Sequence, residues 1–193
     1  RFGSPPTFAA EGVEVVKGPA SILYGGAQPG GFVNIITKKP KAKSAALIDL
    51  RASTYSGAGL SAGDAMGYNL GVDFTGPIDS EERLLYRLVA EYADKDGFRY
   101  NSWDESQYIA PSLTWHATDM TQITAAFEYR KRENSYENNQ LVAPNKDANR
   151  IANIRTRYQE KDDTADEKAY SGTVTVSHYF QNGGTLNLAA RSV

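Results

Sequence analysis

The chain has 193 residues, a net charge of −2 and no cysteine, so a disulfide framework and a thiolate metal site are excluded. The near-neutral charge offers no basic surface for nucleic acid, and two histidines, His116 and His178, leave little for a metal site or a catalytic base. No apolar run approaches the roughly 20 residues of a membrane helix. A mean hydropathy of −0.51 by itself suggests a soluble protein. The strands of a membrane barrel are only half apolar, however, so the value also fits a barrel.

The N-terminal part of the chain contains many glycine and proline residues, which divide it into short elements. Residues 1–10 are weakly patterned, and the valines around Glu14 then predict a short strand. The stretch from Gly18 to Pro40 reads GPASILYGGAQPGGFVNIITKKP. We expect one helical turn after Pro19, a tight glycine loop over residues 27–31, and a strand over residues 32–37.

Glycine-rich stretches can bind phosphate, but the spacing here argues against it. A P-loop needs Lys and Ser or Thr directly after its last glycine, whereas Gly31 is followed by Phe32 and Val33. A G-x-G-x-x-G dinucleotide fingerprint is also absent. The glycines therefore indicate backbone positions that need a positive φ or a close approach.

After Pro40 apolar and polar side chains alternate with a period of two. We expect each patterned segment to belong to a strand of about ten residues, the length with which a tilted strand crosses a bilayer. The seven segments that show this pattern are 48–54, 68–75, 84–93, 108–115, 123–130, 173–177 and 186–191.

The connections between these segments alternate in length. The short ones are 77–83, 117–121 and 181–184, and the longer ones are 56–67, 94–106 and 133–168. Short turns at one end and long loops at the other are typical of an outer-membrane barrel. Aromatic residues near strand ends would form its interfacial girdles: Tyr86, Trp115, Tyr129 and Phe180. A soluble β-sandwich, with these aromatics in its core, is the alternative.

The stretch VEVVKGPASILYGGAQPGGFVNIITKKP resembles the end of the plug domain of TonB-dependent outer-membrane receptors, most closely the ferric-siderophore branch. Lys17 stands where the family usually has Arg, so the charge is kept but the forked donor is lost. The positions that carry the resemblance are Lys17, Gly18, Pro19, Leu23, Tyr24, Gly25, Pro29, Gly30, Gly31 and Asn34.

The resemblance implies a mainly β fold: the C-terminal part of a plug over residues 1–40, then about seven antiparallel strands of a transmembrane β-barrel over residues 41–193. A plugged barrel of this kind has about 22 strands, so the barrel would be incomplete. An open edge in lipid leaves backbone groups unpaired, so we expect the chain to be a fragment that is inactive alone.

The implied function is import of a ferric siderophore through the outer membrane of a Gram-negative cell. Iron would arrive inside its chelator, with no metal or cofactor bound directly, and the partners would be the TonB-ExbB-ExbD complex and outer-membrane lipid, not nucleic acid. No catalytic residue is expected. Ser177 and His178 are adjacent in a strand and point to opposite faces, which excludes a hydrolytic pair. A receptor for another cargo, such as cobalamin or an oligosaccharide, is the alternative.

Four aromatic residues are the candidate ligand contacts. The resemblance places Phe8 near the plug apex, and Phe98, Tyr100 and Trp103 are expected in an outer loop. For Phe8 the alternative is an ordinary aromatic of the plug core.

Overall fold

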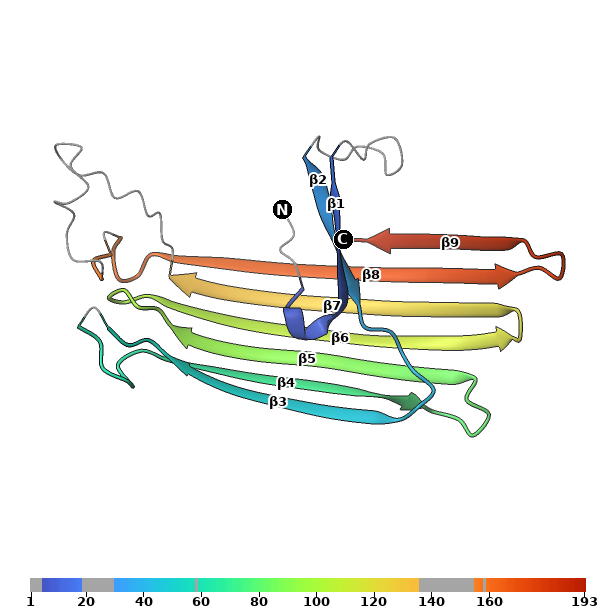
Figure 1. Ribbon diagram of the computed structural model, residues 1–193, viewed down its shortest axis with the longest axis horizontal. Helices are drawn as coiled ribbons and strands as arrows, with labels where there is room; N and C mark the ends of the chain where they lie inside the picture. Colours follow the sequence, from blue (N-terminus) through green and yellow to red (C-terminus); the bar gives the residue numbers. More distant parts are fainter. Residues whose placement is uncertain (1–4, 19–29, 58, 136–154, 158) are drawn as a thin grey trace.

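The computed structural model describes residues 5–18, 30–57, 59–135, 155–157 and 159–193. A short 3-10 helix, η1 (Thr7–Ala9), precedes an antiparallel pair of strands, β1 (Ala10–Lys17) and β2 (Gly31–Thr37). The rest forms one sheet of seven strands (Figure 1). Its members are β3 (Ala45–Thr54), β4 (Met66–Pro77), β5 (Leu84–Asp96), β6 (Trp103–Thr118), β7 (Thr121–Ser135), β8 (Thr164–Tyr179) and β9 (Thr185–Ser192).

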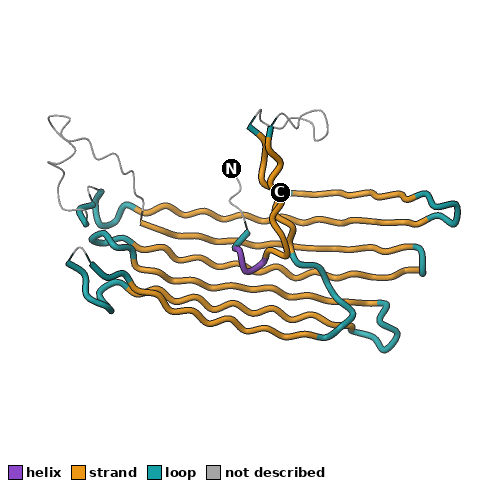
Figure 2. The backbone as a smooth tube through the Cα atoms, viewed as in Figure 1, coloured by secondary structure: helices purple, strands orange, loops and turns teal. Residues whose placement is uncertain are grey.

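The sheet is an antiparallel meander. Each strand pairs with its neighbours in sequence, and β3 and β9 are the two edges, so the sheet is open. The prediction of seven antiparallel strands is confirmed. Figures 1 and 2 show that the ends of β3, β5 and β7 and the starts of β4, β6 and β8 lie at one end of the sheet, here called the loop end. The connections 78–83, 119–120 and 180–184 lie at the opposite end, here called the turn end.

Several strands are longer than the sequence predicted. Strands β6 and β8 have 16 residues each and β7 has 15, against an expected length of about ten. The predicted loops 94–106 and 133–168 were therefore too long, because β6 already begins at Trp103 and β8 at Thr164. The apolar alternation stops before these strand ends, but the ladder continues through charged residues that pair across strands. The pairs Arg132–Asp104 and Arg130–Glu167 are two examples.

The two faces of the sheet carry different side chains. On the face here called the outer face, apolar side chains are left exposed: Leu50, Leu70, Leu113, Trp115, Phe127, Val174 and Leu188. The opposite, inner face carries mainly polar side chains, including Asp73, Thr75, Arg87, Thr114 and Thr124. The predicted separation of the two rows is confirmed, because cross-strand partners such as Leu113 and Ala125 share one face.

Residues 5–18 and 30–43, here called the N-terminal segment, lie over the inner face, with β1 and β2 running across the strands of the sheet (Figure 1). The main hydrophobic cluster lies where η1 meets the sheet: Phe8 and Ala9 pack with Val89 of β5 and Tyr108 of β6. Among the described residues, no helix has the length and apolarity to span a membrane.

Candidate functional site

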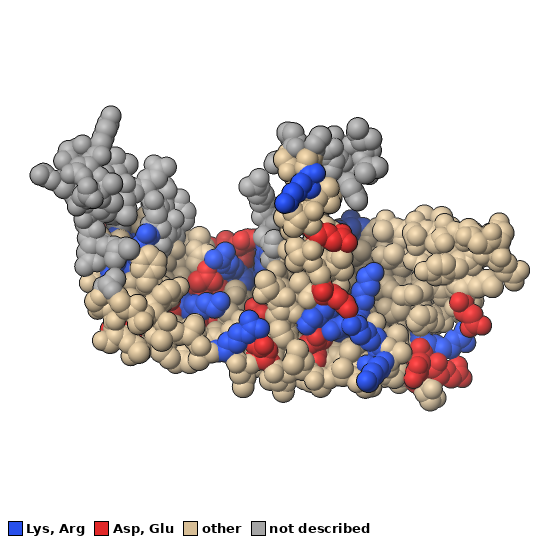
Figure 3. Space-filling model, viewed as in Figure 1, with Lys and Arg blue, Asp and Glu red and all other residues tan. Residues whose placement is uncertain are grey.

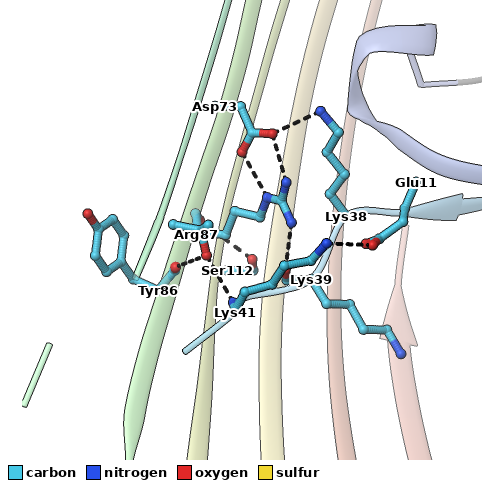
Figure 4. Close-up of polar contacts among 9 residues, drawn as sticks. Glu11, Lys38, Lys39, Lys41, Asp73, Tyr86, Arg87 and Ser112 are labelled. Atoms are coloured by element: carbon cyan, nitrogen blue, oxygen red, sulfur yellow. Dashed lines mark hydrogen bonds and ion pairs between the residues drawn. The ribbon is translucent and has the colours of Figure 1, made fainter. Parts of the chain in front are cut away.

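A buried ion cluster joins the N-terminal segment to the sheet. Asp73 of β4 and Arg87 of β5 are neighbours on the inner face, and Arg87 donates from Nε and Nη2 to the carboxylate at 2.8 and 2.7 Å. Lys38, just after β2, donates to the same carboxylate at 2.8 Å (Figure 4). The side chains of Asp73 and Arg87 are only 6% and 7% exposed, so both charges depend on this pairing.

The main chain of the segment is held at the same place. Arg87 Nη1 donates to the carbonyl oxygen of Lys39 at 2.8 Å, so one guanidinium binds both Asp73 and the backbone of the segment. The backbone N–H of Lys41 donates to Thr75 Oγ1 at 2.9 Å, and that hydroxyl donates to the carbonyl oxygen of Tyr86 (Figure 4). The chain is therefore fixed to β4 and β5 just before it enters β3.

Packing adds to the polar anchor. The Phe8 ring lies against Gly71 of β4, where a Cβ atom would stand 2.9 Å from Phe8 Cζ. The Lys38 ammonium lies 4.4 Å from the centroid of the same ring, a cation–π contact. Gly71 therefore provides the close approach that the aromatic ring needs.

A more exposed ion pair lies on the segment itself. Lys41 Nζ donates to Glu11 Oε1 at 2.8 Å, and this hydrogen bond lowers the pKa of the Glu11 carboxyl below its usual value. Both side chains are about half exposed, so the pair stabilises β1 only weakly.

Beyond the anchor, the segment and the sheet are separated by a hollow of about 370 Å³. One side is formed by β2 and the residues that follow it, including Asn34, Thr37 and Lys39. The other side is the inner face of β6 to β9, where the lining side chains are Ser112, Thr124, Ala126, Glu128, Ser171, Thr173, Thr175 and Arg191. Most of these are small and carry a hydroxyl group.

At the loop end, aromatic and arginine side chains connect the loops. Phe98 makes an edge-to-face contact with Tyr55 at a centroid distance of 6.0 Å, and the Arg155 guanidinium lies 4.4 Å from the centroid of the Tyr100 ring. Arg157 Nη1 donates to the carbonyl oxygen of Asn101 at 2.7 Å. An open hollow of about 520 Å³ lies here, with Phe98 and Trp103 among its lining residues.

Charged side chains line the inner face between this hollow and the N-terminal segment. Arg130 donates to Glu167 at 2.5 Å, and Arg132 donates from Nε to Asp104 at 2.8 Å. Below them, the buried hydroxyl of Tyr108 has no hydrogen-bond partner among the described residues. The inner face therefore carries both basic and acidic side chains here (Figure 3).

The candidate ligand contacts lie in two places. Phe98 and Tyr100 are in the loop between β5 and β6, as predicted, whereas Trp103 is the first residue of β6 and not a loop residue. Phe8 is only 8% exposed and belongs to the hydrophobic cluster, which is the alternative that the sequence left open. In this conformation its ring is covered by the sheet, and its contact with a ligand stays a prediction.

The glycine-rich motif lies partly outside the described residues. Pro19, Leu23, Tyr24, Gly25 and Pro29 fall there, as does the expected helical turn.

The described motif positions surround the start of β2 and the end of β1. Gly18 and Gly31 have φ of +88° and +98°, and a Cβ at Gly31 would stand 2.0 Å from the carbonyl oxygen of Val16, so both need glycine. Gly30 directly precedes β2, and Asn34 donates to Glu14 at 3.0 Å across the β1–β2 pair. Lys17 is exposed at the end of β1.

The ion cluster was missed at the sequence level, although a signal existed. Asp73 and Arg87 each lie inside a predicted strand. In each strand the charged residue is on the face opposite the apolar row. An acidic and a basic residue on the inner rows of consecutive strands are candidates for a pair. Their cross-strand offset, and the arrival of Lys38, require the three-dimensional register.

The part of the chain that the structure describes holds no group of three or more His, Asp or Glu side chains arranged for a metal ion. No family model matches the sequence. Among curated proteins, the chain is 30% identical over 189 residues to the metal-pseudopaline receptor CntO of Pseudomonas aeruginosa, covering 98% of the chain and 25% of the relative. It is 29% identical over 188 residues to the ferrioxamine B receptor of Salmonella typhimurium, with 94% and 25% coverage.

Solved structures share the fold. The ferric-catecholate import receptor Fiu of Escherichia coli, in its open form, gives a TM-score of 0.82 at 20% identity, over 99% of this chain and 30% of that one. FpvA of P. aeruginosa, bound to a heterologous pyoverdine and iron, gives a TM-score of 0.80 at 20% identity, over 95% of this chain and 24% of FpvA. The chain thus spans about a quarter of the length of the curated relatives it matches.

Proposed function

Because this chain belongs to the TonB-dependent outer-membrane receptors, a family of transporters and not of enzymes, we propose that the whole protein imports a ferric siderophore through the outer membrane. The observation that carries the proposal is the similarity, over nearly the whole chain, to receptors whose names specify metal chelates. The two faces of the sheet support it physically.

The outer face fits a lipid environment. Apolar side chains in a soluble protein would be covered, whereas here Leu50 is 75% exposed and Leu188 is 56% exposed. Tyr129 and Tyr170 are paired near the middle of β7 and β8 at a centroid distance of 5.1 Å, and Lys131 and Lys168 lie one step closer to the loop end on the same face. This order, from apolar through tyrosine to charge, is expected where a strand leaves the hydrocarbon and enters the headgroups.

The inner face fits a plugged lumen. In this proposal residues 1–40 are the end of a plug, residues 41–193 are the first part of the barrel wall, and the ion cluster of Lys38, Asp73 and Arg87 attaches one to the other. Energy would come from TonB with ExbB and ExbD, acting on the plug.

The chelate would bind at the loop end, above the N-terminal segment. Phe98, Tyr100 and Trp103 would supply aromatic surface. The guanidinium groups of Arg130 and Arg132, paired here with Glu167 and Asp104, would exchange these carboxylates for the anionic groups of a chelate. The iron stays within its chelator, so the protein needs no direct ligand to the metal.

The test uses the full-length receptor in cells and a radiolabelled ferric siderophore. Replacing Phe98 and Trp103 with Ala should weaken binding about tenfold, because each aromatic contact contributes roughly 0.5–1.5 kcal/mol beyond its area. Trp115→Ala is the matched control, since this tryptophan lies on the outer face near the turn end. Equal affinity in the wild type and the Phe98 and Trp103 variants would remove these residues from the ligand site.

A different cargo is the competing proposal. The name of the CntO relative specifies a metal chelate without specifying iron, and cobalamin or an oligosaccharide would also need a polar lumen. Binding assays on the intact receptor with ferric siderophores, chelates of divalent metals, cobalamin and oligosaccharides separate these cargoes. Binding of one of the others, with no ferric siderophore bound, would replace iron import by that alternative.

A further inference from the structure

The N-terminal segment contacts the sheet unequally. On β4 and β5 it is held by the ion cluster, by the hydrogen bond from Lys41 to Thr75, and by Phe8 packed on Gly71. Over β6 to β9, the hollow of about 370 Å³ lies between β2 and the inner face. Apart from the packing of Phe8 and Ala9 on Tyr108 of β6, the contacts described above lie on β4 and β5.

The wall of this hollow is built from cross-strand rows of short side chains. Ser112 of β6 pairs with Ala126 of β7, and Ala126 pairs with Thr173 of β8. One step toward the turn end, Thr124 of β7 pairs with Thr175 of β8. Side chains of this size leave space above the sheet, while their hydroxyl groups keep the surface polar.

The chemistry of the wall suits a hydrated, oxygen-rich solute. Hydroxyl groups donate and accept hydrogen bonds by rotating, so they can exchange partners with a moving solute at little cost. No aromatic side chain is among those that line the hollow. A solute sliding along Ser112, Thr124 and Thr173 would meet hydroxyl groups, with the charged Glu128, Arg191 and Lys39 also lining the hollow.

We propose that β6 to β8 form the wall of the passage by which a polar metal chelate moves past the plug, while the contacts to β4 and β5 stay in place as the pivot. This inference rests on the proposed import function. It assigns the route to one side of the plug, because the hollow already separates β2 from β6–β8, whereas movement from β4–β5 would expose the paired charges of Asp73 and Arg87.

The first test is a bulky substitution in the hollow of the full-length receptor. Ala126→Trp should lower energised uptake of a ferric siderophore by about tenfold or more, with unchanged ligand affinity, because an indole fills the space that a small side chain leaves open. The matched control is Ala125→Trp, the neighbouring alanine, which lies on the outer face and should leave uptake and affinity unchanged.

A second variant covers the case in which the indole disturbs assembly. The chain has no cysteine, so Ala126→Cys places a thiol in the hollow, and a full-length background without other accessible cysteines keeps the labelling specific. Disulfide-forming reagents of increasing size should reduce uptake in order of size, and a reductant should restore it. The same labelling of Ala125→Cys should have no effect.

The outcomes separate this inference from the function on which it rests. If the wild type neither binds nor imports any ferric siderophore, the proposed function fails. If the wild type imports the chelate, and Ala126→Trp and fully labelled Ala126→Cys import it at the same rate, the passage does not run along β6–β8. A parallel loss of affinity and uptake would place Ala126 in the binding site and would also overturn the inference.

Discussion

Neutralising Asp73 should release the N-terminal segment from the sheet. Asp73→Asn keeps the shape of the side chain but removes the charge that pairs with Arg87 and Lys38. The Arg87 guanidinium, 7% exposed, would then be a buried cation with only an amide oxygen and the Lys39 carbonyl as acceptors. Removing one member of a buried ion pair costs about 3–5 kcal/mol.

The measurement is hydrogen exchange of the β1 and β2 amides in the full-length receptor. If these amides exchange by opening of the segment, a loss of about 3–5 kcal/mol raises their rates by roughly a hundred- to several-thousand-fold, since each 1.4 kcal/mol is a factor of ten. The sheet amides should change much less, because the ladder is intact.

Asp49→Asn is the matched control. Asp49 lies on β3 and pairs with Arg51 of the same strand, whose side chain is 63% exposed, so solvent screens this pair and its loss should matter little. If Asp73→Asn raises the β1 and β2 rates no more than Asp49→Asn does, the ion cluster does not hold the segment and the reasoning is wrong. A double variant that also replaces Arg87 with Leu should recover part of the loss, because it removes the unpaired charge.

Two further predictions concern the N-terminal segment, one its packing on the sheet and one an ion pair within it. Gly71→Ala should displace the Phe8 ring and cost about 1–3 kcal/mol of the free energy that holds the segment on the sheet, which should appear as faster proteolysis of the segment. Gly172→Ala is the control, because a Cβ there meets no atom within 4 Å. Equal proteolysis rates in the two variants would contradict the packing argument. The hydrogen bond from Lys41 holds the pKa of Glu11 below its ordinary value of 4.5, so this ion pair stabilises the segment above that pH and is lost as the pH falls through the folded pKa. The protection of the β1 amides, measured relative to their intrinsic exchange rate at each pH, should therefore fall on acidification below about pH 4.5, more in the wild type than in Glu11→Gln; identical pH profiles of protection would count against the pair.

The positions of the strands could be predicted from the sequence, because each face of this sheet meets one kind of environment and the side chains therefore alternate in polarity along each strand. Leu84, Leu88 and Tyr92 alternate with Leu85, Arg87 and Val89, and a period of two survives whether the outer face meets lipid or water. Strand ends were less readable. Residues 164–168 are too polar to show the alternation, yet their backbone continues the ladder of β8 opposite β7.

The site was only partly readable. Phe98 was placed correctly in a loop, because Asp, Gly and Asn around it signal a turn. Phe8 was a candidate ligand contact with an ordinary plug-core aromatic as the alternative, and its ring packs on β5 and β6, strands that lie more than seventy residues away in the chain. The sequence pattern contains no information on which distant surface an isolated aromatic meets.

The amino-acid order alone thus determined the β architecture, its two-faced strands and the glycine positions beside β1 and β2, since these follow from local backbone geometry and from a period of two. Only the tertiary structure decided that Lys38 reaches Asp73, that Gly71 receives Phe8, and that small hydroxyl side chains of β6 to β8 stand together under β2. These facts depend on the register of neighbouring strands and on the path of the N-terminal segment across them. Both are set by long-range packing, which no window of sequence contains.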